Sequence, residues 1–562
     1  MHAGESHAGR ADPAGARGTV SPPRQVPPPA DRDSSVRRPA ALRWWPAAAW
    51  IGCGIALLAF LLRISLSFGM NSDGANNALQ GWDMLHGHLL LRGWIIGDAT
   101  YYTLELPLYA VTEALLGLSP LTCHVVSALT YLIVVACAAA LAMADSKGPS
   151  RAARCAAVIA VLASPLLTRT GVQILLGVPD HAGTSAIMMV SFLLVDRAPG
   201  RRFTPPLLCA ILCAGQIGDT TVRYVAVPAI LLVCAYRIVA VRKVRTADAA
   251  ILLAAAASLP LARLIRAAMK HFGAFAMVPP STRKSPAGLW PHNVVVALTN
   301  IRTMFGVVPG PHAVLGVAGA AFGLICLLAA LYGFGRVIWT WRTASRSEQL
   351  LCVAIVVFIA VYVVSTLPKL YATFEIISIL PFGAVLAARA CLPARIGGAW
   401  RGRVTLAAAA VAALLPLAAA ATPAPVTPTA VPVAAWLEAH GLTYGIAGYW
   451  DASAVAVQSA DRVQVRAVQS ADRVQFRAVV QPNGKITPYA WETKPSWYDP
   501  SLHDATFVIG YPSGAGGNIT LAMAERNFGR PAAVYQVAGR VIMVYKTNLL
   551  KEIPQIRALP TG

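Results

Sequence analysis

Long apolar segments separated by short polar loops fill most of the chain up to about residue 421. Many of these segments reach the roughly 17–25 residues that a helix needs to cross a bilayer. The pattern predicts eleven membrane-spanning helices near 47–66, 121–144, 154–170, 182–197, 205–218, 222–240, 247–266, 312–334, 349–367, 372–392 and 403–421. The fifth is short, and without it the orientation of everything that follows would be reversed.

Basic residues cluster in every second loop, which is the pattern of cytoplasmic loops. The clusters lie near 37–43, 147–154, 197–202, 242–245, 336–346 and 395–403. This alternation supports the fifth span and predicts a cytoplasmic N-terminus. The intervening loops, and after an odd number of spans the C-terminal region, then face outward. Loop 267–311 carries Lys270, Arg283, Lys284 and Arg302 and departs from the rule.

The segments that flank the apolar region have a different composition. Residues 1–45 are rich in Pro, Ala, Gly and Arg and predict a disordered cytoplasmic tail before a membrane domain at 46–421. Residues 422–432 predict a Pro-rich linker. Residues 433–562 predict a small extracytoplasmic α/β domain. Its expected helices are at 433–440 and 519–527, and its expected strands are at 443–449, 462–468, 505–509, 533–537 and 540–546.

An eleven-residue segment in this last region occurs twice in tandem. AVQSADRVQVR at 456–466 is followed by AVQSADRVQFR at 467–477. Two units are too few for a solenoid, so the copy indicates a recent duplication. One copy is then expected to loop out or to shift the register of a strand.

The composition supports a polytopic α-helical membrane protein. Of 562 residues, 56% are hydrophobic and only 13% are charged, which a soluble fold could not accommodate. The net charge of +22 is scattered in short clusters between apolar segments and forms no basic stripe, so no nucleic-acid partner is expected. The ten cysteines lie in or beside the apolar segments and are interpreted as small buried hydrophobes.

The loop after the first apolar segment concentrates polar chemistry. Residues 70–109 contain Asp73, Asp83, Asp98 and Glu105. Carboxylates beside a membrane are costly to desolvate, so such a cluster indicates a functional site.

This loop resembles the corresponding loop of the GT-C class of membrane glycosyltransferases, which use lipid-phosphate-linked sugars. The elements that carry the resemblance are Asp73, the run GANNALQGWDMLHG from Gly74 to Gly87, and ELPLY from Glu105 to Tyr109. A single Asp73 followed by Gly replaces the commoner acidic pair. The resemblance implies transfer of a sugar from a polyprenyl-phosphate donor to an envelope glycan, lipid or protein. This reaction would take place at the outer face of the cytoplasmic membrane.

The resemblance gives Asp73 the role of general base, which would deprotonate the acceptor hydroxyl, or of a carboxylate that orients the acceptor. The alternative is that Asp73 only caps a helix that starts at Gly74. Asp98 and Glu105 are further catalytic candidates, because they flank Tyr101 and Tyr102, which could stack against a sugar ring. Asp83 is interpreted as a solvated helix residue.

The second outward loop adds Asp180 and His181. By the resemblance, Asp180 contributes to the site or binds a divalent metal. His181 beside it could hydrogen-bond a phosphate, but the preferred interpretation is that it occupies the headgroup region. No spacing of metal ligands establishes a metal site, so the sequence does not decide whether a divalent cation is bound. No nucleotide cofactor is expected, because a lipid-linked donor is already activated.

A lipid phosphate leaving group needs cationic partners. Arg223, Arg283, Lys284 and His292 lie in outward segments and are the substrate-binding candidates for it. Anionic lipid headgroups explain the same cations equally well.

The C-terminal segments GYWDAS (448–453) and PYAWETKPSWYDP (488–500) combine aromatic residues with carboxylates. Such pairs occur at carbohydrate contacts. The preferred interpretation is that Trp450 and Trp497 belong to a small-domain core.

Two other function classes compete with the transferase. A transporter or lipid flippase would place charges near the membrane midplane, whereas the charges here gather in loops. A non-catalytic envelope assembly protein would use its external domain for binding alone.

Overall fold

The structure is a computed structural model. It describes residues 41–178, 180–197, 199–240, 246–278, 282–308, 313–370, 372–470, 484–513 and 519–556. The chain divides into two compact units, Met1–Cys53 and Gly54–Gly562. Residues 1–40 of the expected tail lie outside the described residues, and residues 41–45 belong to the first helix.

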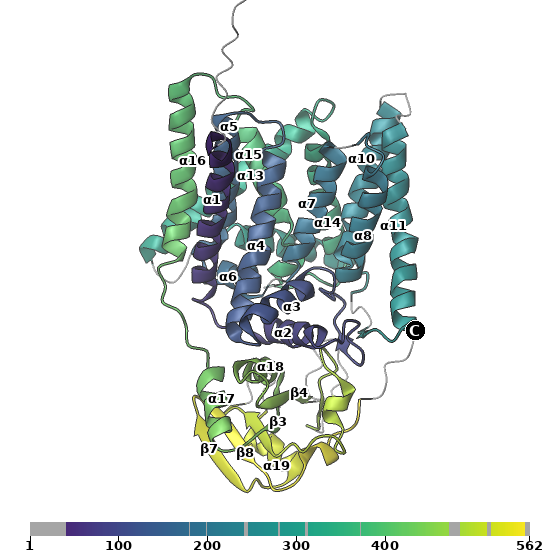
Figure 1. Cartoon of the computed structure of the whole chain (residues 1–562), viewed down its shortest axis with the longest axis vertical. Helices are drawn as coiled ribbons and strands as arrows, with labels where there is room; N and C mark the ends of the chain where they lie inside the picture. The colour runs from purple at the N-terminus through teal and green to yellow at the C-terminus, as the bar shows by residue number, and fades with distance from the viewer. Residues whose placement is uncertain are drawn as a thin grey trace, which may run out of the picture. The chain divides into compact units, whose positions relative to one another are not determined.

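Within the described ranges, eight helices are long and apolar enough to cross a membrane. The first is formed by Ala47–Ser65 of α1 (Ala41–Ser65). The others are α4 (Pro120–Ala142), α5 with the turn after it (Pro149–Leu167), α9 with α10 (Thr221–Ala240), α11 (Thr246–His271), α13 (Ala313–Trp339), α14 (Arg346–Val364) and α16 (Ala399–Ala420). Figure 1 shows α4, α7, α8 and α10 running in similar directions. The chain is therefore a multi-pass helical membrane protein, as predicted.

A ninth span exists if α6 (Arg169–Val172), its continuation to Gly177, and α7 (Ala182–Arg197) are counted together, although they meet at an angle of 70°. Two further apolar helices, α8 (Thr204–Gly218) and α15 (Ile379–Cys391), are shorter. Each of the eleven expected spans overlaps a helix, but the count of eleven is not established. The break before α7 matters most, because it presents Asp180 and His181.

Two short helices and a small sheet lie at one end of the bundle. Helix α2 (Ser72–Leu85) packs on α3 (Glu105–Leu116). Between them, β1 (Ile95–Ile96) pairs in parallel with β2 (Ala276–Met277). On its other side Ile95 exchanges two backbone hydrogen bonds with Thr493, with N···O distances of 2.7 and 3.0 Å. The loop therefore holds the C-terminal region through the backbone.

The C-terminal sheet domain contains six strands in the order β5-β4-β3-β6-β8-β7. Strands β4, β3 and β6 are parallel, and the other pairs are antiparallel. The strands are β3 (Tyr444–Gly448), β4 (Gln464–Ser470), β5 (Ile486–Pro488), β6 (Phe507–Gly510), β7 (Ala533–Val537) and β8 (Arg540–Val544). The helices are α17 (Ala430–Ala439), α18 (Tyr449–Gln458) and α19 (Leu521–Phe528). All five expected strands and both expected helices overlap these elements, whereas α18 and β5 were not predicted.

The tandem repeat does not form two equivalent units. The first copy runs from the end of α18 into β4, and the second begins inside β4. Residues 471–477 of the second copy lie outside the described residues.

Candidate active site

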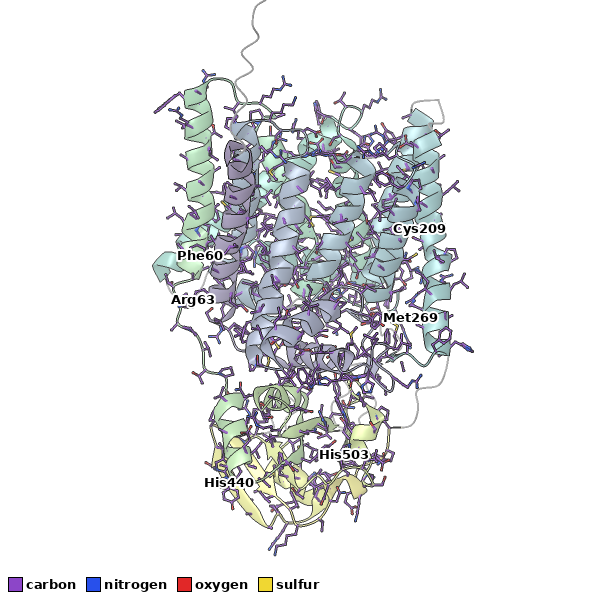
Figure 2. The ribbon with its side chains drawn as sticks, viewed as in Figure 1. Phe60, Arg63, Cys209, Met269, His440 and His503 are labelled. Carbon is purple, nitrogen blue, oxygen red and sulfur yellow. The ribbon has the colours of Figure 1, made fainter. Side chains whose placement is uncertain are left out.

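Asp73 lies in the first turn of α2 and is joined to the C-terminal domain. The N-cap of this helix is Asn71, whose Oδ1 accepts from the Gly74 amide at 2.9 Å, so the alternative role of Asp73 as the cap is wrong. The hydroxyl of Tyr449 donates to Asp73 Oδ1 and also lies 3.1 Å from Glu492 Oε2. Burial raises the pKa of Asp73, and the hydrogen bond from Tyr449 opposes that rise. The layer between α2 and α18 is filled with side chains (Figure 2).

Asp180 supplies a second carboxyl group to the same region. The Tyr101 hydroxyl donates to its Oδ1 at 3.1 Å. Burial and then the charge of Asp73 raise the pKa of Asp180 to about 7. Two acidic groups that interact this closely do not both ionise easily, so the cluster carries a proton near neutral pH.

His181 is the cation of the site. Its Nδ1 lies 2.6 Å from Asp219 Oδ2, and its Nε2 lies 3.8 Å from Glu375 Oε2. Burial would lower the pKa of His181, but Asp219, Glu375 and Asp180 outweigh burial and raise it to about 10. The ring is therefore an imidazolium at neutral pH. His181 has a φ of 52°, a left-handed conformation that costs free energy and is found at functional sites.

Asp219 is fixed by three donors. Besides His181, the Thr184 hydroxyl donates to its Oδ2 at 2.6 Å and the Thr221 amide to its Oδ1 at 2.8 Å. Burial opposes ionisation of this carboxyl, but these contacts lower its pKa to about 2. A stable anion thus holds the His181 ring in place.

Glu105 begins α3 and is 1% exposed. Its Oε1 accepts from the Gly183 amide at 3.0 Å. Burial raises the pKa of Glu105 to about 8. It lies behind the His181 loop and supports that loop.

The other candidates from the first loop have different surroundings. Asp98 accepts from the Ala99 amide at 3.1 Å. Burial and, to a smaller extent, the charge of Asp98 raise the pKa of Glu375, whereas His181 opposes that rise. Tyr102 donates to the Leu89 carbonyl at 2.8 Å and is not part of the Asp180 contact. The interpretation of Asp83 as a solvated residue is wrong, because it accepts from Lys494 Nζ and Trp94 Nε1, both at 2.8 Å. Asp83 therefore joins the first loop to the C-terminal domain.

The four expected phosphate-binding cations lie elsewhere. Arg223 stacks on Tyr224, and Lys284 lies over Trp290. The backbone of Arg283 pairs with Thr366, and His292 is exposed on α12 (Trp290–Met304). In the described part of the chain, none of the four has a recorded hydrogen bond or ion pair with the acidic cluster. Arg63, near the end of α1 (Figure 2), has a buried Nη1 without a partner among these residues.

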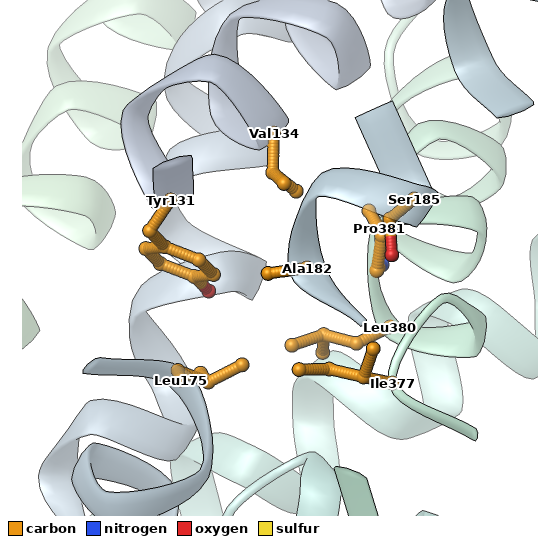
Figure 3. A pocket seen from close by; sticks show the side chains of 8 residues that line it. All are labelled: Tyr131, Val134, Leu175, Ala182, Ser185, Ile377, Leu380 and Pro381. Carbon is orange, nitrogen blue, oxygen red and sulfur yellow. The ribbon is translucent and has the colours of Figure 1, made fainter. Parts of the chain in front are cut away.

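The described residues contain no group of three or more His, Cys, Asp or Glu side chains arranged to hold a metal ion. A cavity of about 10 Å³, room for one water molecule, lies beside the site. Figure 3 shows the side chains that line this cavity, which are those of Tyr131, Val134, Leu175, Ala182, Ser185, Ile377, Leu380 and Pro381. A larger surface hollow of about 560 Å³ lies near Trp339 and Trp341. Neither hollow includes a carboxylate of the cluster.

Sequence reasoning missed Asp219, Glu375, Tyr449 and Glu492. Asp219 lies in GDTTVR, a segment considered only for Arg223. Tyr449 and Glu492 lie in the two aromatic segments of the C-terminal domain, which were interpreted mainly as core. That interpretation is wrong for Trp450, which is 57% exposed, whereas Trp497 packs against buried clusters. The available signal was the pairing of aromatic residues with carboxylates.

The helical bundle, the α2–α3 layer and the C-terminal sheet domain together form the fold of the GT-C class, as the first loop predicted. The chain is similar to ArnT from Cupriavidus metallidurans in its apo state, with 13% sequence identity and a TM-score of 0.52 over 91% of this chain and 100% of that one. The chain is also similar to ArnT from the same organism bound to undecaprenyl phosphate. Here the sequence identity is 12% and the TM-score is 0.53, over 90% of this chain and 99% of that one. A third match is the archaeal oligosaccharyltransferase AglB from Archaeoglobus fulgidus, in complex with an inhibitory peptide and a dolichol-phosphate. Its sequence identity is 12% and its TM-score is 0.39, over 75% of this chain and 64% of that one. No family model and no curated protein sequence matches the chain.

Proposed function

We propose that the chain is a membrane glycosyltransferase that takes a sugar from a polyprenyl-phosphate donor. The acceptor is an envelope glycan, lipid or protein at the outer face of the cytoplasmic membrane. The observation that carries the proposal is a half-buried carboxylate, Asp73, in the first turn of α2 in a GT-C fold. The similarity to ArnT bound to undecaprenyl phosphate supports a lipid-phosphate donor.

In the proposed reaction, the acceptor oxygen forms a bond to the anomeric carbon of the sugar. The bond from that carbon to the phosphate oxygen breaks, and its electron pair leaves with the polyprenyl phosphate. The proton of the acceptor hydroxyl passes to Asp73. Burial suits Asp73 to this role, because a general base works best when its pKa is near the working pH.

The other groups have supporting roles in this proposal. Asp180 and Tyr101 orient the hydroxyl groups of the sugar. The His181 imidazolium is the nearby positive charge for the leaving phosphate, and hydrogen bonds from a cation to phosphate are strong. Asp219 and Glu375 keep that imidazolium charged and oriented.

The test is Asp73→Asn, with Asp504→Asn at an exposed position of the C-terminal domain as the matched control. Each variant is expressed in a deletion strain, and its glycolipid and wall-polysaccharide profile is compared with that of the parent. Transfer should fall by about 10²–10⁴, the usual value of general base catalysis, at normal expression. Full activity of Asp73→Asn would favour an assembly role without catalysis, and an unchanged profile in the deletion strain would refute the proposed function.

Topology is tested separately with a C-terminal reporter. A reporter that is active only in the cytoplasm should be silent, because the proposal places the C-terminal domain outside. Activity of that reporter would put Asp73 on the wrong side for an outer-face reaction.

A further inference from the structure

The hydroxyl of Tyr449 lies among three polar groups, of which two are carboxyl groups that compete for its single proton. It contacts Asp73 Oδ1, lies 3.1 Å from Glu492 Oε2 and lies 3.3 Å from Asn76 Nδ2. A phenol has one O–H to donate and oxygen lone pairs with which to accept. Tyr449 can therefore donate to only one of the two carboxyl groups.

The orientation of Asn76 fixes one of these contacts. The Ser453 hydroxyl donates to Asn76 Oδ1 at 2.5 Å, so the NH₂ group of the same amide points toward Tyr449. Asn76 then donates to the phenol oxygen and occupies one of its lone pairs. Since Asn76 is a donor here, the proton of Tyr449 goes to Asp73 or to Glu492.

The surroundings favour Asp73 as the ionised partner. Asp73 lies in the first turn of α2, where the helix dipole stabilises a negative charge. Its Oδ2 also lies 3.4 Å from Asn71 Nδ2. Glu492 is 6% exposed, has a φ of 49° and lies in the loop between β5 and Pro495 rather than in the first turn of a helix.

We propose that Glu492 is a positioning residue for Asp73. It is a neutral acid that donates its proton to the Tyr449 oxygen, so that the Tyr449 proton is committed to Asp73. This keeps Asp73 ionised and turned toward the acceptor. The inference rests on the proposed role of Asp73 as the base. During the reaction Asp73 takes the acceptor proton, and Glu492 keeps its own.

Two acidic groups that face Glu492, Asp73 from α2 and Asp180 from the break before α7, favour its neutral form. Hydrogen bonds with Tyr449 from α18 and Asn76 from α2 favour the ionised form instead, and Tyr101 and Tyr489 also face Glu492. Burial, followed by the charges of Asp73 and Asp180, raises the pKa of Glu492 well above its ordinary value. When Glu492 loses its proton at alkaline pH, the Tyr449 hydroxyl can donate to either of two carboxylates. Asp73 then loses its fixed orientation. The rate should therefore fall on the alkaline side through Glu492.

The experiment compares Glu492→Gln and Glu492→Ala, with Glu525→Gln on α19 as the exposed control. Gln cannot ionise but keeps an N–H that can donate to Tyr449. Transfer from undecaprenyl-phosphate-linked monosaccharides to a total lipid extract is followed across pH. Glu492→Ala should lose about tenfold in rate, the value of one hydrogen bond. Glu492→Gln should recover most of that loss and lack the alkaline decline.

Infrared difference spectroscopy tests the protonation directly and needs no substrate. At neutral pH, wild type minus Glu492→Gln should contain the carbonyl band of a protonated carboxylic acid, and the Glu525 control should not. Absence of that band overturns the inference, as does an unchanged alkaline decline in Glu492→Gln or full activity of Glu492→Ala. If Asp73→Asn transfers normally, the proposed function fails, whereas the infrared band still decides the state of Glu492.

Discussion

The ion pair between His181 and Asp219 makes the most direct prediction about this site. Asp219→Asn keeps the shape of the side chain but removes its charge. The side-chain oxygen of Asn can still accept from Thr184. Its NH₂ group must then face the Thr221 amide, which is also a donor, so the hydrogen bond to Thr221 is lost. The imidazolium of His181 loses its closest anion and stays buried, so its pKa should fall, although Glu375 and Asp180 still oppose the effect of burial.

The expected cost can be worked out in two ways. Removing one partner of a buried ion pair costs about 3–5 kcal/mol. A rise in the pKa of His181 from 6.5 to about 10 corresponds to roughly 5 kcal/mol at 1.36 kcal/mol per unit. Because the variant retains some hydrogen bonding, we expect a loss in the free energy of unfolding near the lower figure, about 3 kcal/mol.

The pH dependence follows from the direction of the shift. A raised pKa of His181 means that the pair stabilises the fold fully below pH 6.5 and loses this contribution as the pH rises toward about 10. The assay is thermal unfolding in detergent across this range, with Asp504→Asn as the control. The deficit of Asp219→Asn should be largest just below pH 6.5 and should shrink toward pH 10. A deficit that grows with pH, or none at pH 6.5, would refute a charged His181.

Three more predictions follow from other contacts. A Cβ on Gly183 would lie 2.4 Å from Glu105 Oε1, so Gly183→Ala should lower the unfolding free energy by about 1–3 kcal/mol, whereas Gly200→Ala, with open space around it, should not. Lys494→Met removes the 2.8 Å bond to Asp83, and hydrogen exchange at the Thr493 and Ile95 amides should become faster while exchange in β6 stays slow. Unchanged exchange at Thr493 would count against the docking role. Treatment with a strong chelator should leave transfer intact, because protons and His181 already offset the charge of the cluster; recovery of lost activity by added Mg²⁺ would contradict this.

The sequence predicts the fold correctly wherever an element depends only on its own local pattern of residues. Apolar length located the helices, because backbone groups in lipid must be paired within a helix. Alternating residues located β4, and β3, β6, β7 and β8 also overlap the strands expected from the sequence. Helix α18 was missed because ASAVAVQ alternates small and branched apolar residues and carries no cap signal. The number of spans was not fixed because α8 and α15 are shorter than a bilayer crossing requires.

The site was only partly accessible, for a different reason. Asp73, Asp180, Tyr101 and His181 lie in two loops that are polar against an apolar background. Glu492 lies more than 400 residues from Asp73 in the sequence, and no local pattern pairs them. Outward cations were predicted to hold the phosphate, yet a histidine whose charge depends on Asp219 is the cation at the cluster. Charge created by a neighbour cannot be read from residue type.

The contacts of the C-terminal domain argue that it completes the site. Tyr449 contacts the proposed base, and Glu492 contacts Tyr449. Lys494 pairs with Asp83, and Thr493 extends the sheet through Ile95. Three of these four residues lie within a stretch of three positions, so one loop both docks the domain and orients Asp73. A domain that only captured acceptor would have no need to place a carboxyl group 6% exposed beside another acid. The cost of burying Glu492 is instead offset at its contact with Tyr449, the side chain that also donates to Asp73.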